Sequence, residues 1–284
     1  MIRKPAVAGT FYEGDPDSLT GRIEWCFKHQ LGPGRIPENL GKKREIKSVI
    51  APHAGYMYSG PVAAHSYLKL AEDGLPETFL ILCPNHTGMG SGVSTVSEGE
   101  WETPLGLVEI DSEFSLKLQE NAPIIDSEPL AHLQEHSCEV QLPFLQHLAQ
   151  KWDKEFKIVP ICLWMQDLQT TSEIGDAIAQ TSQELKRDVV IVASTDFTHY
   201  KPQEVASKTD HQVLDAIKDL DEKTMMKRVQ ELNVTMCGFG TVASAIVASK
   251  KLGAKKAEIL KYATSGDITG DHSAVVGYAS AVII

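Results

Sequence analysis

The 284-residue chain lacks long apolar runs, closely spaced cysteines and any excess of positive charge. No stretch approaches the roughly 18 to 20 apolar residues that a membrane-spanning helix needs, so a membrane protein is not expected. Lys and Arg number 27 against 38 Asp and Glu, and the net charge of −11 disfavours broad binding to nucleic acid or to anionic membranes. The N-terminal residues also lack the apolar core of a secretory signal, and we therefore expect a cytoplasmic protein.

Cysteine is scarce and unpaired in the sequence. The five cysteines are widely spaced and none forms a CxxC pair, which disfavours a disulfide framework. Most of them are expected to be small buried residues. The ten histidines are more informative, because three of them recur in one structural context.

A series of short apolar runs rich in Val and Ile is typical of strands that are buried on both faces. Strands are expected at 48–51, 79–83, 158–163, 189–193 and 274–284. Helical patterns cover 61–72, 112–120, 171–186, 203–218, 222–232 and 241–252, with a further start near Ser137. Pro61 is expected at a first helical position and Ser112 as an N-cap, while 87–106 is expected to be irregular and to fold over a site. This alternation predicts an α/β fold: one αβα-layered domain over residues 1–284 with a mostly parallel or mixed central sheet.

Three histidines follow the carboxyl ends of predicted strands. His53 comes after the strand at 48–51, His86 after 79–83, and His199 after 189–193. Ligand sites in open α/β sheets form at this edge, so side chains far apart in sequence can meet there. The sequence therefore predicts a site shared by the three imidazoles.

Imidazole nitrogens commonly bind zinc, iron and copper, and two of them with a thiolate leave positions open for a substrate. Cys237 is the leading candidate for the thiolate, because it precedes a predicted helix whose dipole is expected to lower the pKa of the thiol. The alternative is that Cys237 only packs beside neighbouring glycines. The candidate metal ligands are thus His53, His86, Cys237 and His199.

Other polar residues are candidates for the same site. Asp196 could accept a proton from the ring of His199 and orient it, or could instead cap the following turn. His136 could line the site or pack at a helix start. Tyr56 and Tyr58 follow the first histidine in what is expected to be an exposed loop, where they could supply phenolic donors.

The chain resembles the Memo family, in particular its archaeal and bacterial members. The resemblance rests on motifs that span nearly the whole chain in family order: RKPAVAGTFY at 3–12, PHAGY at 52–56, PNHTG at 84–88, EHS at 135–137, STDFTHY at 194–200 and CG at 237–238. Memo proteins in turn resemble class III extradiol dioxygenases, which have one αβα domain and a nonheme iron held by two histidines and a glutamate.

The resemblance implies roles for individual residues. His53 and His86 match the two ligand histidines of the dioxygenases, and His199 matches their acid/base histidine. Cys237 falls where the dioxygenases have the ligand glutamate, and this replacement disfavours ring cleavage, because a thiolate changes both the preferred metal and its redox behaviour. Iron or copper is the implied metal, with zinc possible. A pathway shared with a radical SAM protein and a homo-oligomeric state are also compatible with the resemblance.

Three functions follow as hypotheses. The first is a metal-dependent redox enzyme that acts on a small molecule or peptide, with His199, Asp196 and His136 as candidate catalytic residues. The second is a non-catalytic module that binds a peptide or anion in the same pocket. The third is a metal-assisted hydrolase, which would work with redox-inert zinc.

Overall fold

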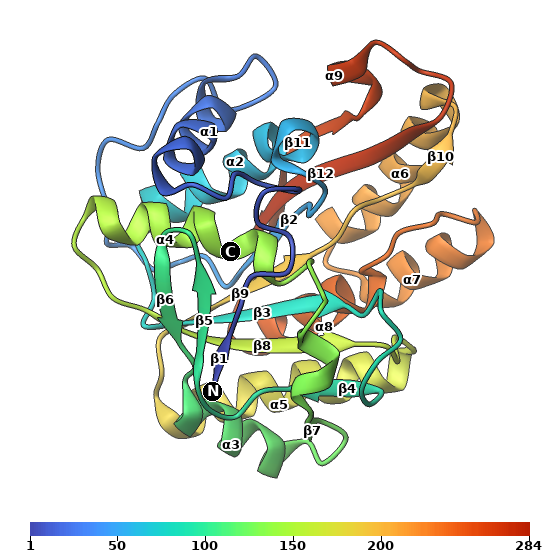
Figure 1. The fold of residues 1–284 in the computed structure, drawn as a ribbon. Coiled ribbons are helices and arrows are strands. Elements are labelled where there is room, and N and C mark those ends of the chain that lie inside the picture. Colours follow the sequence, from blue (N-terminus) through green and yellow to red (C-terminus); the bar gives the residue numbers. More distant parts are fainter.

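The computed structural model describes residues 1–284 and places a nine-stranded mixed sheet between two layers of helices (Figure 1). The strand order is β10-β12-β2-β9-β3-β8-β4-β7, and β11 pairs antiparallel with β12. The central strands β2, β9, β3 and β8 are parallel to one another, whereas β12 runs antiparallel to β2 and β4 runs antiparallel to β8. The strands are β2 (Ser48–Ala51), β3 (Thr78–Pro84), β4 (Val93–Thr95), β7 (Asp126–Ser127), β8 (Lys157–Leu163), β9 (Val189–Ser194), β10 (His199–Lys201), β11 (Ala257–Thr264) and β12 (Val275–Ile283). The predicted α/β class with a mixed central sheet is confirmed.

Alternation along the strands explains why both faces of the sheet are covered. In β3, Leu80 and Leu82 belong to one hydrophobic core, while Phe79, Ile81 and Cys83 belong to the other. Successive side chains of a strand point to opposite faces, so a continuous apolar run needs helices on both sides. All seven residues of β3 are buried.

The helices divide between the two cores. One face of the sheet is covered by α3 (Ser112–Asn121), α5 (Leu168–Leu185), α6 (Gln203–Lys218), α7 (Glu222–Glu231) and α8 (Phe239–Lys251). The other face is covered by α1 (Pro16–Lys28), α2 (Tyr56–Asp73) and α4 (Leu142–Lys151). A short helix, α9 (Gly266–Thr269), lies in the connection between β11 and β12, and single 3-10 turns cover Pro129–His132 and Glu139–Gln141.

A second, three-stranded sheet lies outside the main one. It is built from β1 (Ile2–Arg3), β5 (Glu100–Thr103) and β6 (Gly106–Glu109), in the order β1-β5-β6. The prediction of irregular structure throughout 87–106 was therefore wrong, because this stretch contains β4 and β5. Both strands have only three or four residues, which is too short for a periodic pattern to stand out.

Two predicted helix starts were also wrong. The helix α2 begins at Tyr56, so Pro61 lies inside it, and its first turn is fixed by the N–H of Tyr56, which donates to the carbonyl of Phe11. Asp111, not Ser112, caps α3, because its carboxylate accepts from the N–H of Phe114. The helix α1 and the strand β11 were not among the predicted elements.

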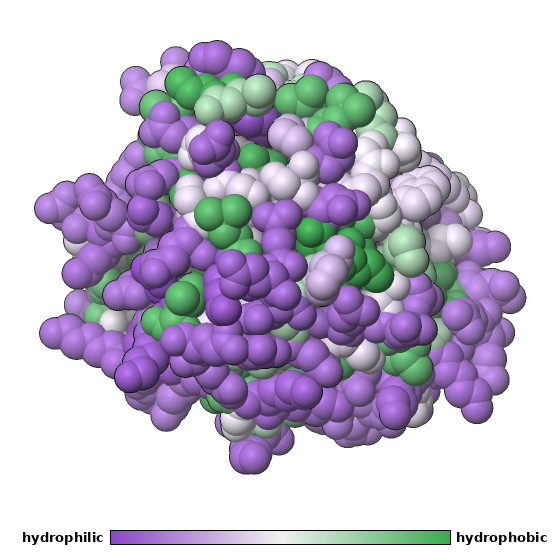
Figure 2. Space-filling model, turned by 90° about the horizontal axis from the view of Figure 1, so that it is seen from below, coloured by the Kyte–Doolittle hydropathy of each residue, from purple (hydrophilic) through white to green (hydrophobic).

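The exposed surface is dominated by polar and charged groups. On the face shown in Figure 2, hydrophilic residues cover most of the area and hydrophobic residues form small separate groups. No helix of the structure combines the length and the apolar character that crossing a membrane would require.

Candidate metal centre

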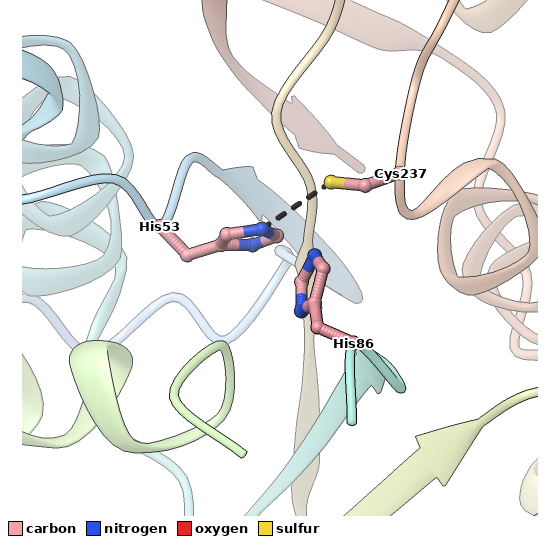
Figure 3. Close-up of side chains that lie close together, drawn as sticks. All are labelled: His53, His86 and Cys237. Atoms are coloured by element: carbon pink, nitrogen blue, oxygen red, sulfur yellow. Dashed lines mark hydrogen bonds between the residues drawn. The ribbon is translucent and has the colours of Figure 1, made fainter. Parts of the chain in front are cut away.

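His53, His86 and Cys237 meet at the carboxyl edge of the sheet (Figure 3). His53 follows β2, His86 follows β3, and Cys237 lies two residues before the start of α8. One potential ligand atom from each residue lies within 4.8 Å of the other two, and the Sγ of Cys237 lies 3.3 Å from Nε2 of His53. The predicted convergence of distant side chains at this edge is present for these three residues.

His53 is held by the end of β9. Its backbone N–H donates to Oδ1 of Asp196 at 2.9 Å, and its Nδ1 lies 2.8 Å from Oγ of Ser194. The Ser194 hydroxyl donates its own proton to the carbonyl of Ser137 and accepts from the Gln141 amide. It can therefore only accept from the ring, so Nδ1 carries the proton and Nε2 of His53 faces Cys237 with a lone pair.

His86 is held by the buried carboxylate of Glu135. Oε1 of Glu135 lies 2.9 Å from Nδ1 of the ring, and Oε2 accepts from the backbone N–H of His86 at 2.6 Å. Burial alone would lower the pKa of His86, but hydrogen bonds with Cys237 and Glu135 raise it to about 10. Burial would likewise raise the pKa of Glu135, yet the same contact with His86 outweighs it and holds that pKa at about 2. At this pKa both nitrogens of the His86 ring carry a proton at pH 7. Nδ1 keeps its proton beside Glu135, and a metal that binds Nε2 must displace the proton there.

The Cys237 thiol is held by the chain that follows β9. The N–H of Asp196 lies 3.2 Å from the sulfur, and the N–H of Cys237 donates to the carbonyl of Asp196. The sequence predicted a lowered pKa at this helix start, but burial raises the pKa of the Cys237 thiol, because the cost of removing a thiolate from water outweighs the hydrogen bonds with His86 and the backbone of Asp196. A metal that binds the sulfur must therefore displace its proton.

His199 lies near this group but is not one of the three residues whose ligand atoms converge. Its Nδ1 lies 2.9 Å from the carbonyl of Thr235, and its backbone N–H donates to Oγ1 of the same residue. Because a carbonyl only accepts, Nδ1 of His199 carries the proton and Nε2 is free.

The expected pairing of Asp196 with the ring of His199 is replaced by these contacts with Thr235. The Asp196 carboxylate instead accepts from the backbone of His53, and burial raises its pKa to about 6. Asp196 therefore helps to place His53, the first of the candidate ligands.

His136 lies on the wall of the site. Its ring centroid is 4.7 Å from that of His86, 5.4 Å from that of His53 and 4.8 Å from that of Phe11. Burial lowers its pKa to about 4, so the ring is neutral at pH 7. His136, His86 and Glu135 form a second group of possible ligand atoms, but Oε1 of Glu135 already accepts from both the N–H and the hydroxyl of Ser137. This carboxylate is better suited to holding His86 than to binding an ion.

The two tyrosines that follow His53 lie in helix α2. Tyr56 is buried and its hydroxyl donates to the carbonyl of Val140, so the expectation of an exposed loop was wrong for this residue. Tyr58 lies in the same helix and is half-buried.

The sequence interpretation assigned no role to Glu135, Ser194 or Thr235. Each is a hydrogen-bond partner of an imidazole Nδ1. Glu135 stands directly before His136, and Ser194 stands two residues before Asp196. Their place in these motifs is the only sequence signal that could have indicated a role. Thr235 lies 36 residues from its partner and gives no such signal.

The donor set fits a transition metal. Two imidazole nitrogens and one thiolate bind zinc, iron or copper, and three protein ligands leave coordination positions for other molecules. Each imidazole also has the outer hydrogen-bond partner that metal-bound histidines usually have.

The sheet order and this group of side chains define an α/β protein with a candidate metal centre at the carboxyl edge of its sheet. A family profile described as Memo-like protein matches residues 3–282, and the chain belongs to the Memo family. It is 56% identical to a MEMO1 family protein of Methanothermobacter thermautotrophicus, over 98% of this chain and 99% of that one. It is 54% identical to a MEMO1 family protein of Methanopyrus kandleri, over 99% of each chain. The crystal structure of an uncharacterized Escherichia coli K12 protein shares the fold, with a TM-score of 0.57 and 14% identity over 84% of this chain and 99% of that chain.

Proposed function

We propose that the protein binds a transition metal ion through Nε2 of His53, Nε2 of His86 and Sγ of Cys237, and uses it in a redox reaction. The observation that carries the proposal is the convergence of these three atoms within 4.8 Å, with both Nδ1 atoms occupied by other partners. The side chains of such a site need little movement to receive an ion, because Nε2 of each ring already lies close to the other ligand atoms. Binding would release the protons held by His86 and Cys237.

Iron or copper is the proposed metal. Both cycle between oxidation states, and both accept mixed nitrogen and sulfur ligands. When bound, the metal would supply one-electron chemistry on a small molecule or peptide that enters the open positions.

The remaining site residues would exchange protons with a bound ligand, form hydrogen bonds to it, or hold the metal ligands in place. Nε2 of His199 is free to exchange a proton with a bound ligand, because Nδ1 is used by Thr235. His136 is neutral and lines the wall, where it can donate or accept a hydrogen bond. Asp196 holds the backbone of His53 in place.

Metal titration tests the proposal. Apo-protein prepared without oxygen is titrated with Fe(II), Cu(II) and Zn(II), and bound metal is measured after gel filtration. The His53→Ala, His86→Ala double variant and Cys237→Ser should each lose more affinity than the about 10- to 100-fold that removal of an outer partner costs. His211→Ala, which changes an exposed residue of α6, is the matched control.

Three outcomes would overturn this proposal. Unchanged affinity in the double variant would exclude the metal site. Turnover supported by zinc would favour a metal-assisted hydrolase. Ligand binding that survives chelation of the metal would favour a binding module.

A further inference from the structure

A side-chain clamp joins the loop after β8 to the turn that carries Cys237. Nε2 of Gln166 donates to the carbonyl of Cys237 at 2.9 Å, and Oε1 accepts from the N–H of Gly240 at 2.7 Å. The two contacts need opposite ends of the amide, so together they fix its orientation. We propose that Gln166 is a positioning residue that fixes the Cys237 sulfur for metal binding, an inference that rests on the proposed function.

Close approach of the clamp depends on glycine. A Cβ at Gly240 would lie 2.7 Å from Cβ of Gln166, and a Cβ at Gly238 would lie 2.4 Å from the carbonyl oxygen of Ser194. Any side chain at either position would push the turn away from one of its two neighbours. The turn is therefore enclosed between Gln166 on one side and the end of β9 on the other.

The end of β9 supplies the opposing contacts. The N–H of Cys237 donates to the carbonyl of Asp196 at 3.3 Å, and the N–H of Gly238 donates to Oγ1 of Thr195 at 3.0 Å. These bonds hold the turn from the sheet, while Gln166 holds it from the loop. If the turn were held from only one side, it could rotate and move the Cys237 sulfur. Both sets of contacts are therefore needed to fix the position of the sulfur.

The loop that carries Gln166 is itself anchored to the segment after His86. The N–H groups of Trp164 and Met165 both donate to the carbonyl of Gly92 at 2.9 Å. The Trp164 ring lies beside Gly88, where a Cβ would be 3.8 Å from it. Gln166 thus links the segments that bear His86 and Cys237, two of the three proposed ligands.

A purely structural role must be separated from a positioning role. Gly238, the N-cap of α8, makes no side-chain capping bond, so Gln166 also satisfies a donor in the first turn of this helix. If Gln166 had only this structural role, loss of the bond would lower the stability of the fold but leave the metal affinity and the metal–sulfur bond unchanged. Cobalt(II) distinguishes the two roles, because its absorption reports directly on the bond to the thiolate.

The experiment measures Co(II) affinity and the sulfur-to-cobalt charge-transfer absorption of the full-length protein. Gln166→Leu removes both contacts, and Gln166→Glu keeps the acceptor for the N–H of Gly240 while removing the donor to Cys237. Gln150→Leu on α4 is the matched control, because it removes a single amide contact with the carbonyl of Leu105 far from the site. Both Gln166 variants should lose about 10- to 100-fold in affinity and show a weaker thiolate band, and the control should match the wild type.

A double-mutant cycle with Cys237→Ser completes the test. If Gln166 acts through the sulfur, Gln166→Leu should cause no further loss of affinity once the sulfur is absent. An equal further loss, or a wild-type affinity and thiolate band in the Gln166→Glu protein, would overturn the proposal. If Cys237→Ser itself left Co(II) affinity unchanged, the proposed metal site would be wrong irrespective of Gln166.

Discussion

Nδ1 of His86 lies 2.9 Å from Oε1 of Glu135, and this contact turns Nε2 of the ring toward Cys237 (Figure 3). The same carboxylate accepts from the backbone N–H of His86, so one buried side chain fixes both the position and the ring orientation of a proposed ligand. An outer carboxylate of this kind also makes the imidazole a better electron donor to a metal.

We expect Glu135→Gln to lower metal affinity by about 10- to 100-fold, because the amide removes the negative charge that the His86 ring faces. Competition with a chromophoric chelator measures the effect. Glu98→Gln, a change of the same type at an exposed position, is the control. Equal affinities in the two variants would show that Glu135 does not support a metal ligand.

The N-terminal segment is tied to the wall of the site through Glu139. This fully buried carboxylate pairs with Arg3 and accepts from the N–H groups of Ala6 and Val7 and from the hydroxyl of Tyr12. Glu139→Gln should lower the free energy of unfolding by about 3 to 5 kcal/mol, because it leaves the guanidinium buried without a counter-charge.

Urea unfolding measures the effect of Glu139→Gln. Glu102→Gln, which breaks the exposed pair with Lys4, should cost no more than about 1 kcal/mol. Similar losses in the two variants would contradict a special role for the buried pair.

Tyr200 has a left-handed backbone, with φ of 59°, at an irregularity in the pairing of β10 with β12. Its side chain is 78% exposed, so the ring contributes little packing to offset a conformation that costs roughly 1 to 2 kcal/mol. Tyr200→Gly should therefore raise the stability slightly, by about 0.5 to 1 kcal/mol after the greater entropy of glycine in the unfolded chain is subtracted.

Thermal unfolding compares this variant with Tyr200→Ala, which loses the ring and keeps the strain. The alanine variant should show no gain in stability. A gain of equal size in both would mean that the ring, and not the backbone, is unfavourable.

Acid sensitivity should depend in part on His132. Burial, with the nearby charge of Arg3, lowers the pKa of this ring to about 4, against about 6.5 in an unfolded chain. Below pH 6.5 the unfolded state binds a proton that the folded state does not, so stability falls as the pH drops toward 4. The loss from this residue is about 2 kcal/mol between pH 7 and pH 5.

His132→Gln keeps a donor for the carbonyl of Ser94 and has no titrating group. The unfolding free energy of this variant is measured in urea at pH 7 and at pH 5. Between these two pH values it should fall by about 2 kcal/mol less than that of the wild type. His211→Gln, at an exposed ring, should behave as the wild type. A wild-type pH dependence in the His132 variant would show that His132 is not a source of the acid sensitivity.

Local patterns were sufficient for much of the fold. The apolar runs that became β2, β3, β8 and β9 were evident because these strands are buried on both faces, so every residue carries the signal. The short strands β4 and β7 have two or three residues and depend on their neighbours, and no local pattern could show them.

The sequence by itself determined the α/β class and the placement of His53 and His86 at strand ends, because the hydrophobic pattern shows which segments of the chain are buried strands. Only the tertiary structure decided which atoms face the site. The partners of the imidazole rings, Ser194, Glu135 and Thr235, come from other segments of the chain, and a hydrogen bond between distant segments leaves no trace in local sequence. The thiol of Cys237 shows the same limit, since its pKa depends on burial by the whole fold and not on the helix that follows it.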